Sequence, residues 1–261
     1  MPEQREPNAS GGIVDEPRHL TDRELYTFDT CGFLVERDFI GADDCAAVES
    51  VLEPSWPEPD PDDPVQRIDD VADHPVVADL IADTVARSGV YDTINQPLRV
   101  IESYALRRGE GSIQPLHNGR SNVNQSARGV SHRAMWREHT YHDGLLYCMM
   151  VKALVYLSDI STPEDGPLVV VEGSHKANYP YPHSRSEVDA GAGLDDPGTR
   201  PVYTRAGDLV LLNEALTHGS RAKATQGYRS FVAFSFAPSF VADYEALPDD
   251  SLSLVGTGFC E

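Results

Sequence analysis

The chain has 261 residues, a hydrophobic content of 40% and a formal net charge of -21. This length suits one large domain with its own core, while so much negative charge argues against binding to nucleic-acid polymers or anionic membranes. The absence of a membrane-length apolar run or a secretory signal, together with four widely scattered cysteines, predicts a reducing, cytoplasmic location.

The first ninety residues combine a polar tail with helical patterns. Residues 1–19 are polar and contain Pro and Gly-Gly, so we expect a disordered tail ahead of a single domain at 20–261. Thr21 and Glu24 have the spacing of a helix-initiating capping box, and His74-Pro75 is a second favourable helix start. The predicted helices span residues 21–32, 43–52 and 75–89.

After residue 97 the apolar pattern changes from helical to strand-like. Residues 109–144 lack a long apolar period and are predicted to form an extended loop or lid, with Trp136 and His139 as candidate pocket residues. Strands are predicted at 98–106, 145–157, 168–171, 201–204, 209–212 and 230–236. Short strands that follow N-terminal helices predict a mainly β fold with flanking helices (α+β). The specific expectation is a double-stranded β-helix, a cupin-like jelly-roll barrel, buttressed by those helices.

Two histidines, His117 and His218, are candidate metal ligands. Imidazole nitrogen suits divalent iron, and histidines that are distant in sequence can converge inside a barrel. Two histidines alone are weak evidence for a metal site. The elements around His218 strengthen it, because Gly207-Asp208 introduces an apolar strand that this histidine follows.

A candidate anion-binding residue, Arg229, follows His218 in the sequence. Arg229 opens the next predicted strand eleven residues later. A guanidinium fork can bind a carboxylate through two parallel hydrogen bonds, and Ser220 can add a hydroxyl donor. This spacing predicts a site for the far end of an acidic cosubstrate.

Several segments together resemble the phytanoyl-CoA dioxygenase family of Fe(II)/2-oxoglutarate enzymes, over most of residues 20–240. The segments are Cys31-Gly-Phe-Leu-Val, Ser103-Tyr-Ala-Leu, Leu154-Val-Tyr-Leu-Ser-Asp159, Gly166-Pro-Leu-Val-Val-Val-Glu-Gly-Ser-His-Lys176, Ala206-Gly-Asp208, His218-Gly-Ser220 and Arg229-Ser-Phe231. The resemblance implies that His218 binds iron and that Arg229, with Ser220, binds 2-oxoglutarate. It implies a structural role for His175. The implied cofactors are Fe(II), 2-oxoglutarate and O2.

The sequence departs from this family at Gly119. The family usually has His-x-Asp, whereas this chain has His117-Asn118-Gly119 and contains no His-x-Asp or His-x-Glu. Glycine could leave a coordination position open for chloride, which is the pattern of iron/2-oxoglutarate halogenases, with Asn118 and Arg120 flanking the vacancy. We therefore predict a halogenase that chlorinates an unactivated aliphatic C–H bond.

Two alternatives remain open. Water could fill the vacant position, or a distant Asp143 or Glu172 could reach the metal, and in either case the enzyme would be a hydroxylase or oxidase of a small molecule. The non-enzymatic alternative is a catalytically inactive protein that only binds a small molecule.

The charge pattern near His117 bears on the substrate. Residues 99–137 contain seven arginines and two glutamates, which gives 7 - 2 = +5. A local positive patch can concentrate a small anion, so we expect an anionic, for example nucleotide-like, metabolite as substrate. Trp136, Tyr141 and His142 are candidates for stacking on a ring or base, with a packing role as the alternative for each.

Overall fold

The computed structural model describes residues 17–60, 62–118, 139–177, 187 and 191–241. Most of the tail predicted at 1–19 and the central part of the lid predicted at 109–144 lie outside these residues. The described ends of that lid segment include two short strands.

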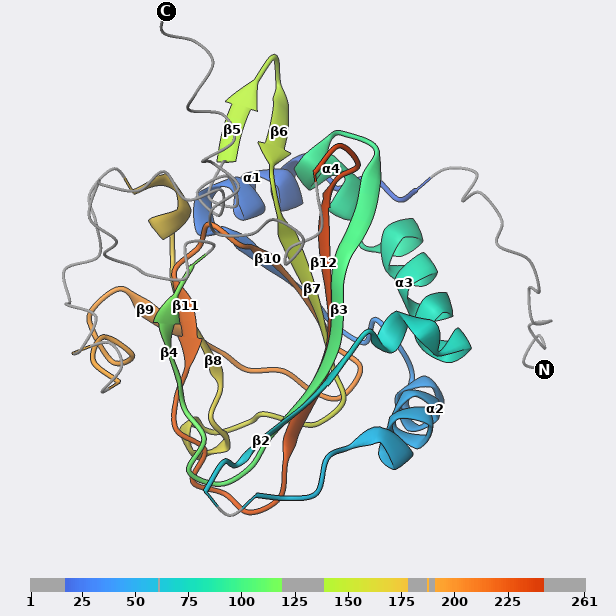
Figure 1. The fold of residues 1–261 in the computed structure, drawn as a ribbon. Coiled ribbons are helices and arrows are strands. Elements are labelled where there is room, and N and C mark those ends of the chain that lie inside the picture. Colours follow the sequence, from blue (N-terminus) through green and yellow to red (C-terminus); the bar gives the residue numbers. More distant parts are fainter. Residues whose placement is uncertain (1–16, 61, 119–138, 178–186, 188–190, 242–261) are drawn as a thin grey trace, which may run out of the picture.

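Two antiparallel sheets face each other and form the barrel (Figure 1). The larger sheet has the order β1 (Phe33–Glu36), β10 (Leu209–Asn213), β7 (Val151–Tyr156), β12 (Arg229–Pro238), β3 (Leu98–Arg108) and β2 (Val65–Asp69). The smaller sheet has the order β4 (Gln114–His117), β11 (His218–Ser220), β8 (Leu168–Val171) and β9 (Thr199–Val202). A separate hairpin joins β5 (His139–His142) to β6 (Leu145–Cys148). This architecture confirms the predicted mainly β barrel.

Helices from the N-terminal part of the chain pack beside the larger sheet. They are α1 (Asp22–Cys31), α2 (Ala42–Leu52), α3 (Pro75–Arg87) and α4 (Val90–Ile94), and short 3-10 turns lie at Glu53–Ser55, Val71–Asp73, Pro163–Asp165 and Ser174–Lys176. The predicted capping box is present, because the Thr21 hydroxyl accepts a hydrogen bond from the Glu24 backbone N–H. Figure 1 places α2 and α3 outside the larger sheet, as expected for helices that buttress a barrel.

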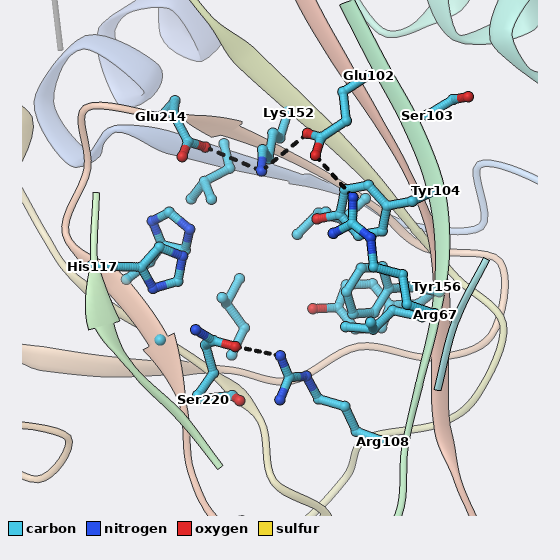
Figure 2. Close-up of a pocket in the computed structure, with 18 of the residues that line it drawn as sticks. Arg67, Glu102, Ser103, Tyr104, Arg108, His117, Lys152, Tyr156, Glu214 and Ser220 are labelled. Atoms are coloured by element: carbon cyan, nitrogen blue, oxygen red, sulfur yellow. Dashed lines mark hydrogen bonds and ion pairs between the residues drawn. The ribbon is translucent and has the colours of Figure 1, made fainter. Parts of the chain in front are cut away.

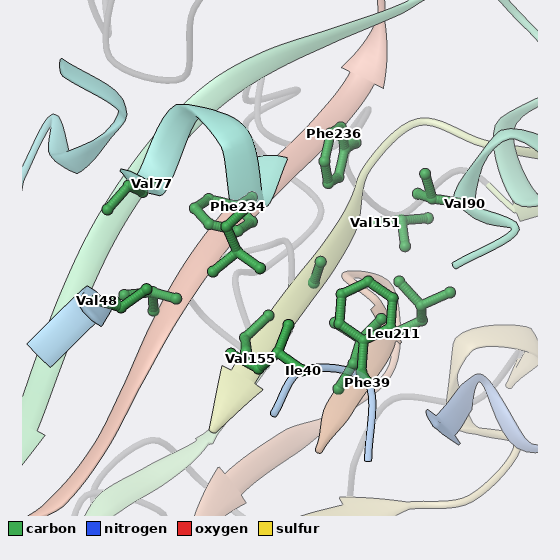
Figure 3. Packing of buried hydrophobic residues seen from close by; sticks show 14 of the residues in the cluster. Phe39, Ile40, Val48, Val77, Val90, Val151, Val155, Leu211, Phe234 and Phe236 are labelled. Atoms are coloured by element: carbon green, nitrogen blue, oxygen red, sulfur yellow. The ribbon is translucent and has the colours of Figure 1, made fainter. Parts of the chain in front are cut away.

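Alternation along the strands separates a helix-facing core from the barrel interior. On β12, Val232, Phe234 and Phe236 pack in the cluster that includes residues of α2 and α3, which Figure 3 shows from close by. The neighbouring residues Phe231 and Ala233, on the opposite face of the strand, belong to the second cluster, between the two sheets. Successive side chains of a strand point to opposite faces, so the helices bury one face and leave the other to line the barrel.

The strand predicted at 145–157 is divided in two. Leu145–Cys148 pairs with β5, whereas Val151–Tyr156 pairs with β10 and β12. The residues between them, Met149 and Met150, are not in a strand, and Met150 is fully buried. The apolar sequence therefore continues through the break between the two strands. For this reason the composition of the segment does not reveal the break.

Two further observations concern the described residues. None of their helices is both long enough and apolar enough to cross a membrane. Cys31, Cys45 and Cys148 are free thiols.

Candidate active site

A large cavity lies between the two sheets, with a volume of about 1180 Å³. Its walls come from both sheets and from residues next to them, and Figure 2 shows how polar side chains project into it. The cavity thus uses the strand faces that the helices leave uncovered. It contains five of the residues predicted for the site, namely His117, Asn118, His218, Ser220 and Arg229.

The structure brings His117 and His218 together across two neighbouring strands. They are direct partners in the β4–β11 register, and their ring centroids lie 4.3 Å apart. Gly219 allows the close approach of these strands, because a Cβ atom there would meet the Gln114 carbonyl oxygen at 2.6 Å. A pairing of residues about a hundred positions apart therefore builds a two-imidazole site.

Hydrogen bonds orient both rings in the same way. His117 Nδ1 lies 2.9 Å from the Pro115 carbonyl oxygen, and His218 Nδ1 lies 2.8 Å from the Leu216 carbonyl oxygen. A carbonyl oxygen only accepts, so each Nδ1 carries the proton and each Nε2 keeps its lone pair. Burial, aided by the neighbouring His218, lowers the pKa of His117 to about 3, and burial lowers the pKa of His218 to about 4. Two neutral imidazoles with available Nε2 atoms suit a divalent cation.

The described residues contain no cluster of three or more His, Cys, Asp or Glu side chains that could hold a metal ion. Asp143 is largely exposed, and its carboxylate oxygen Oδ2 lies 3.2 Å from His142 Nε2. Glu172 forms an ion pair with Arg200. Neither acid lines the cavity. The structure thus brings neither of the proposed distant carboxylates to the histidine pair.

Of the residues at the predicted vacancy, Asn118 is the one that the structure describes. Asn118 is buried, and its side-chain amide donates a hydrogen bond to the Thr217 hydroxyl at 3.3 Å. Gly119 and Arg120 lie outside the described residues.

Two buried arginines lie in the same cavity as the histidine pair. Arg229 donates a hydrogen bond from one terminal nitrogen to the Ser220 hydroxyl at 3.2 Å, but its buried Nε has no hydrogen-bond partner in the described part of the chain. Arg108 donates to the Gln114 side-chain oxygen, as Figure 2 shows. Burial and the charge of Arg229 lower the pKa of Arg108 to about 10. Neither arginine pairs with a carboxylate of the described residues, so this pair of like charges has the chemistry of a site for an anion.

A chain of charges forms another part of the cavity wall. Lys152 Nζ lies 3.5 Å from a Glu102 oxygen and 3.7 Å from a Glu214 oxygen (Figure 2). Glu102 also accepts hydrogen bonds from the Arg67 guanidinium at 3.1 Å and from the Ser235 hydroxyl at 2.8 Å. Burial alone would raise the pKa of Glu102, but Lys152 and these donors together lower it.

The sequence reasoning did not identify this chain of charges, nor Arg108. The available signal was a charged side chain within an otherwise apolar strand, as at Lys152 in β7. In a strand with both faces buried, such a residue indicates an interior polar site.

The other residues considered from sequence lie elsewhere. Tyr141 and His142 are exposed in the β5–β6 hairpin, and Trp136 lies outside the described residues. His139 Nε2 is 3.1 Å from an Asp29 carboxylate oxygen, and His139 does not line the cavity. His175 is also buried away from the cavity, with its Nε2 2.9 Å from the Asp29 carbonyl oxygen.

Comparison with known proteins adds independent information. The model of the phytanoyl-CoA dioxygenase (PhyH) family matches residues 28–231. No curated protein sequence matches the chain.

Several solved structures share the fold. HygX from Streptomyces hygroscopicus, solved with nickel, 2-oxoglutarate and hygromycin B bound, is 41% identical, with 93% of this chain and 97% of that chain covered and a TM-score of 0.77. HygX has also been solved with iron bound. EctD from S. alaskensis is 22% identical, with 88% and 80% of the two chains covered and a TM-score of 0.60. AviO1 from Streptomyces viridochromogenes Tue57 is 18% identical, with 83% and 94% covered and a TM-score of 0.57. At these lower identities EctD and AviO1 show the fold alone.

Proposed function

The chain belongs to the phytanoyl-CoA dioxygenase family of Fe(II)/2-oxoglutarate-dependent oxygenases, and on this premise we propose that it oxidises an aliphatic C–H bond of a small molecule in the cavity between its two sheets. The observation that carries the proposal is the His117–His218 pair, whose rings are both oriented with Nε2 available. Iron with 2-oxoglutarate and O2 supplies the oxidising chemistry in such sites.

The protein side of the reaction is assigned to particular atoms. Nε2 of His117 and Nε2 of His218 bind Fe(II). The guanidinium of Arg229 and the hydroxyl of Ser220 bind the distal carboxylate of 2-oxoglutarate, which gives the unpaired Arg229 Nε an acceptor. Arg108 contributes a second positive charge in the same cavity.

The size of the cavity supports a second occupant besides 2-oxoglutarate. Its volume of about 1180 Å³ lies above the range of ordinary small-molecule pockets, about 300–1,000 Å³. HygX was solved with both 2-oxoglutarate and hygromycin B. We infer that the substrate of this chain is likewise a small molecule bound beside the cosubstrate.

The expected anionic substrate has less support than the cosubstrate. Among the described arginines of the +5 run, Arg107 pairs with Glu53 and Arg99 donates to the Val241 carbonyl oxygen. Arg108 faces the cavity together with Arg229. The anion that these two arginines attract is, in our proposal, 2-oxoglutarate itself.

Anaerobic addition of Fe(II) and 2-oxoglutarate tests the proposal. We expect a weak visible charge-transfer band that requires both components, because 2-oxoglutarate must chelate the iron held by the two histidines. The same titration with succinate in place of 2-oxoglutarate is the control and should give no band. Absence of the band with 2-oxoglutarate would favour the alternative of a binding protein without catalysis.

Halogenation is the second candidate function. It is favoured because the described residues offer no third His, Cys, Asp or Glu side chain that could complete a metal site with the two histidines. Chlorination would require a halide in the position that the carboxylate fills in the common two-histidine, one-carboxylate iron site. Hydroxylation with water in that position is the competing possibility.

Substitution of Gly119 separates these two possibilities. With halide at the iron, bromide should shift the charge-transfer band of the parent and of Gly119→Ala, which adds only a methyl group. Gly119→Asp should abolish the shift and any chlorination, because its carboxylate competes for the position. A parent band that does not respond to bromide, or a Gly119→Asp variant that chlorinates as well as the parent, would exclude Gly119 as the halide position.

A further inference from the structure

Glu214 is a buried acid that the proposed chemistry does not use. It follows β10 directly, its side chain is 4% exposed, and it lines the cavity. One of its carboxylate oxygens, Oε2, is buried and has no hydrogen-bond partner among the described residues. A carboxylate only accepts hydrogen bonds, so a donor that enters the cavity would stabilise it.

The neighbouring lysine does not satisfy this acid. Lys152 Nζ is 3.7 Å from Glu214 Oε2, which is beyond hydrogen-bond distance, and it is closer to Glu102, at 3.5 Å. Glu102 in turn has the Arg67 guanidinium and the Ser235 hydroxyl as donors. Glu214 is therefore the acid of this chain of charges with the greatest unmet demand for a donor.

The charges of the cavity lining outside the arginine pair favour a cationic donor. The described acids that line the cavity are Asp69, Asp70, Glu102 and Glu214. Apart from the arginine pair assigned to 2-oxoglutarate, the described cations of the lining are Arg67 and Lys152, which gives 2 - 4 = -2. Outside the arginine pair, the described lining is therefore net negative and attracts positive charge.

The position of Glu214 relates it to the reaction centre. Figure 2 shows its carboxylate on the same side of the cavity as His117. The described residues nevertheless offer no set of three metal ligands that includes Glu214. Glu214 thus lines the histidine side of the cavity, where it can contact a molecule bound next to the histidine pair.

We propose that Glu214 binds a protonated amine of the substrate and thereby positions a neighbouring C–H bond at the histidine pair. The inference rests on the proposed function and specifies its substrate class: a small molecule that carries an ammonium group. Lys152 lies between Glu214 and Glu102, and Glu102 anchors Lys152 from the other side.

Calorimetric titration with two matched sugars tests the amine preference. D-glucosamine carries an ammonium group at C2, where D-glucose carries a hydroxyl. Each sugar is added to the anaerobic protein loaded with Fe(II) and 2-oxoglutarate. We expect glucosamine to bind about tenfold more tightly than glucose, as befits a hydrogen bond to a charged group. Equal binding of the two sugars, or no binding of glucosamine, would overturn the proposal.

Two variants assign the preference to its residue. Glu214→Gln keeps the shape but removes the charge, so the preference should fall below about twofold. Glu172→Gln removes a carboxylate outside the cavity and should keep the tenfold preference. Persistence of the preference in Glu214→Gln would assign it elsewhere and overturn the proposal.

Iron affinity and the metal-free protein keep this proposal distinct from the proposed function. Glu214→Gln should bind Fe(II) as tightly as the parent, and a loss of iron would instead make Glu214 a metal ligand. The sugar titrations are repeated on the metal-free protein. If the metal-free protein keeps the preference, the amine site is supported independently of iron. If, in addition, Fe(II) and 2-oxoglutarate give no charge-transfer band, the oxygenase proposal fails while the amine site stands.

Discussion

His218→Ala is expected to weaken Fe(II) binding by more than about 100-fold, because loss of a group that merely hydrogen-bonds to a metal ligand already costs about 10–100-fold. Only two histidines form the proposed site, so its loss removes half of the protein's ligands. The charge-transfer band with 2-oxoglutarate should disappear at Fe(II) concentrations that saturate the parent.

A matched histidine outside the cavity controls for this effect. His142 is exposed in the β5–β6 hairpin, with 77% of its side chain accessible, and it does not line the cavity. His142→Ala should bind Fe(II) like the parent. If His218→Ala keeps parental iron affinity while its thermal unfolding is unchanged, His218 is not a ligand.

Arg229→Met should raise the dissociation constant of 2-oxoglutarate by about 30-fold, which corresponds to about 2 kcal/mol for a lost charge-assisted interaction. Arg229 is buried, and no described residue accepts a hydrogen bond from its Nε, so the bound carboxylate would provide this acceptor. Arg108 remains in the variant and retains part of the attraction for the anion. Titration of the charge-transfer band with 2-oxoglutarate at saturating Fe(II) measures the change.

A surface arginine provides the comparison for Arg229. Arg200 is exposed and pairs with Glu172, so Arg200→Met should leave 2-oxoglutarate binding unchanged. Were Arg229→Met to require no more 2-oxoglutarate than the parent, the cosubstrate would have to bind in another part of the cavity.

Local patterns predicted much of the fold because they depend on neighbouring residues. The Thr21–Glu24 capping box and the Pro75 helix start both appear where the sequence indicates them. Short, strand-like apolar segments likewise predicted β12 and β10. The break between β6 and β7 escaped prediction, because each half pairs with a different sheet and both halves are apolar.

The site depends on pairing across long distances in sequence, and this limited its prediction. Spacing singled out His218 and Arg229, and the structure adds that His117 is the cross-strand partner of His218. The charges of Glu102, Lys152 and Glu214 come from β3, β7 and the end of β10, and no local pattern connects them.

Charge counting along the chain illustrates the same limit. The +5 count treats Arg107 and Arg108 as one patch. In β3 they point to opposite faces, with Arg107 against Trp56 and Glu53, and Arg108 in the cavity. A sum over consecutive residues of a strand mixes the barrel interior with the outer face.

An anaerobic crystal of the protein with Fe(II) and 2-oxoglutarate, measured at the iron absorption edge, is the most direct measurement of the two-histidine centre. The account predicts one anomalous peak within coordination distance of Nε2 of His117 and Nε2 of His218, with the 2-oxoglutarate distal carboxylate on Arg229. An iron peak that either histidine fails to contact, or no iron in the cavity at all, would contradict it.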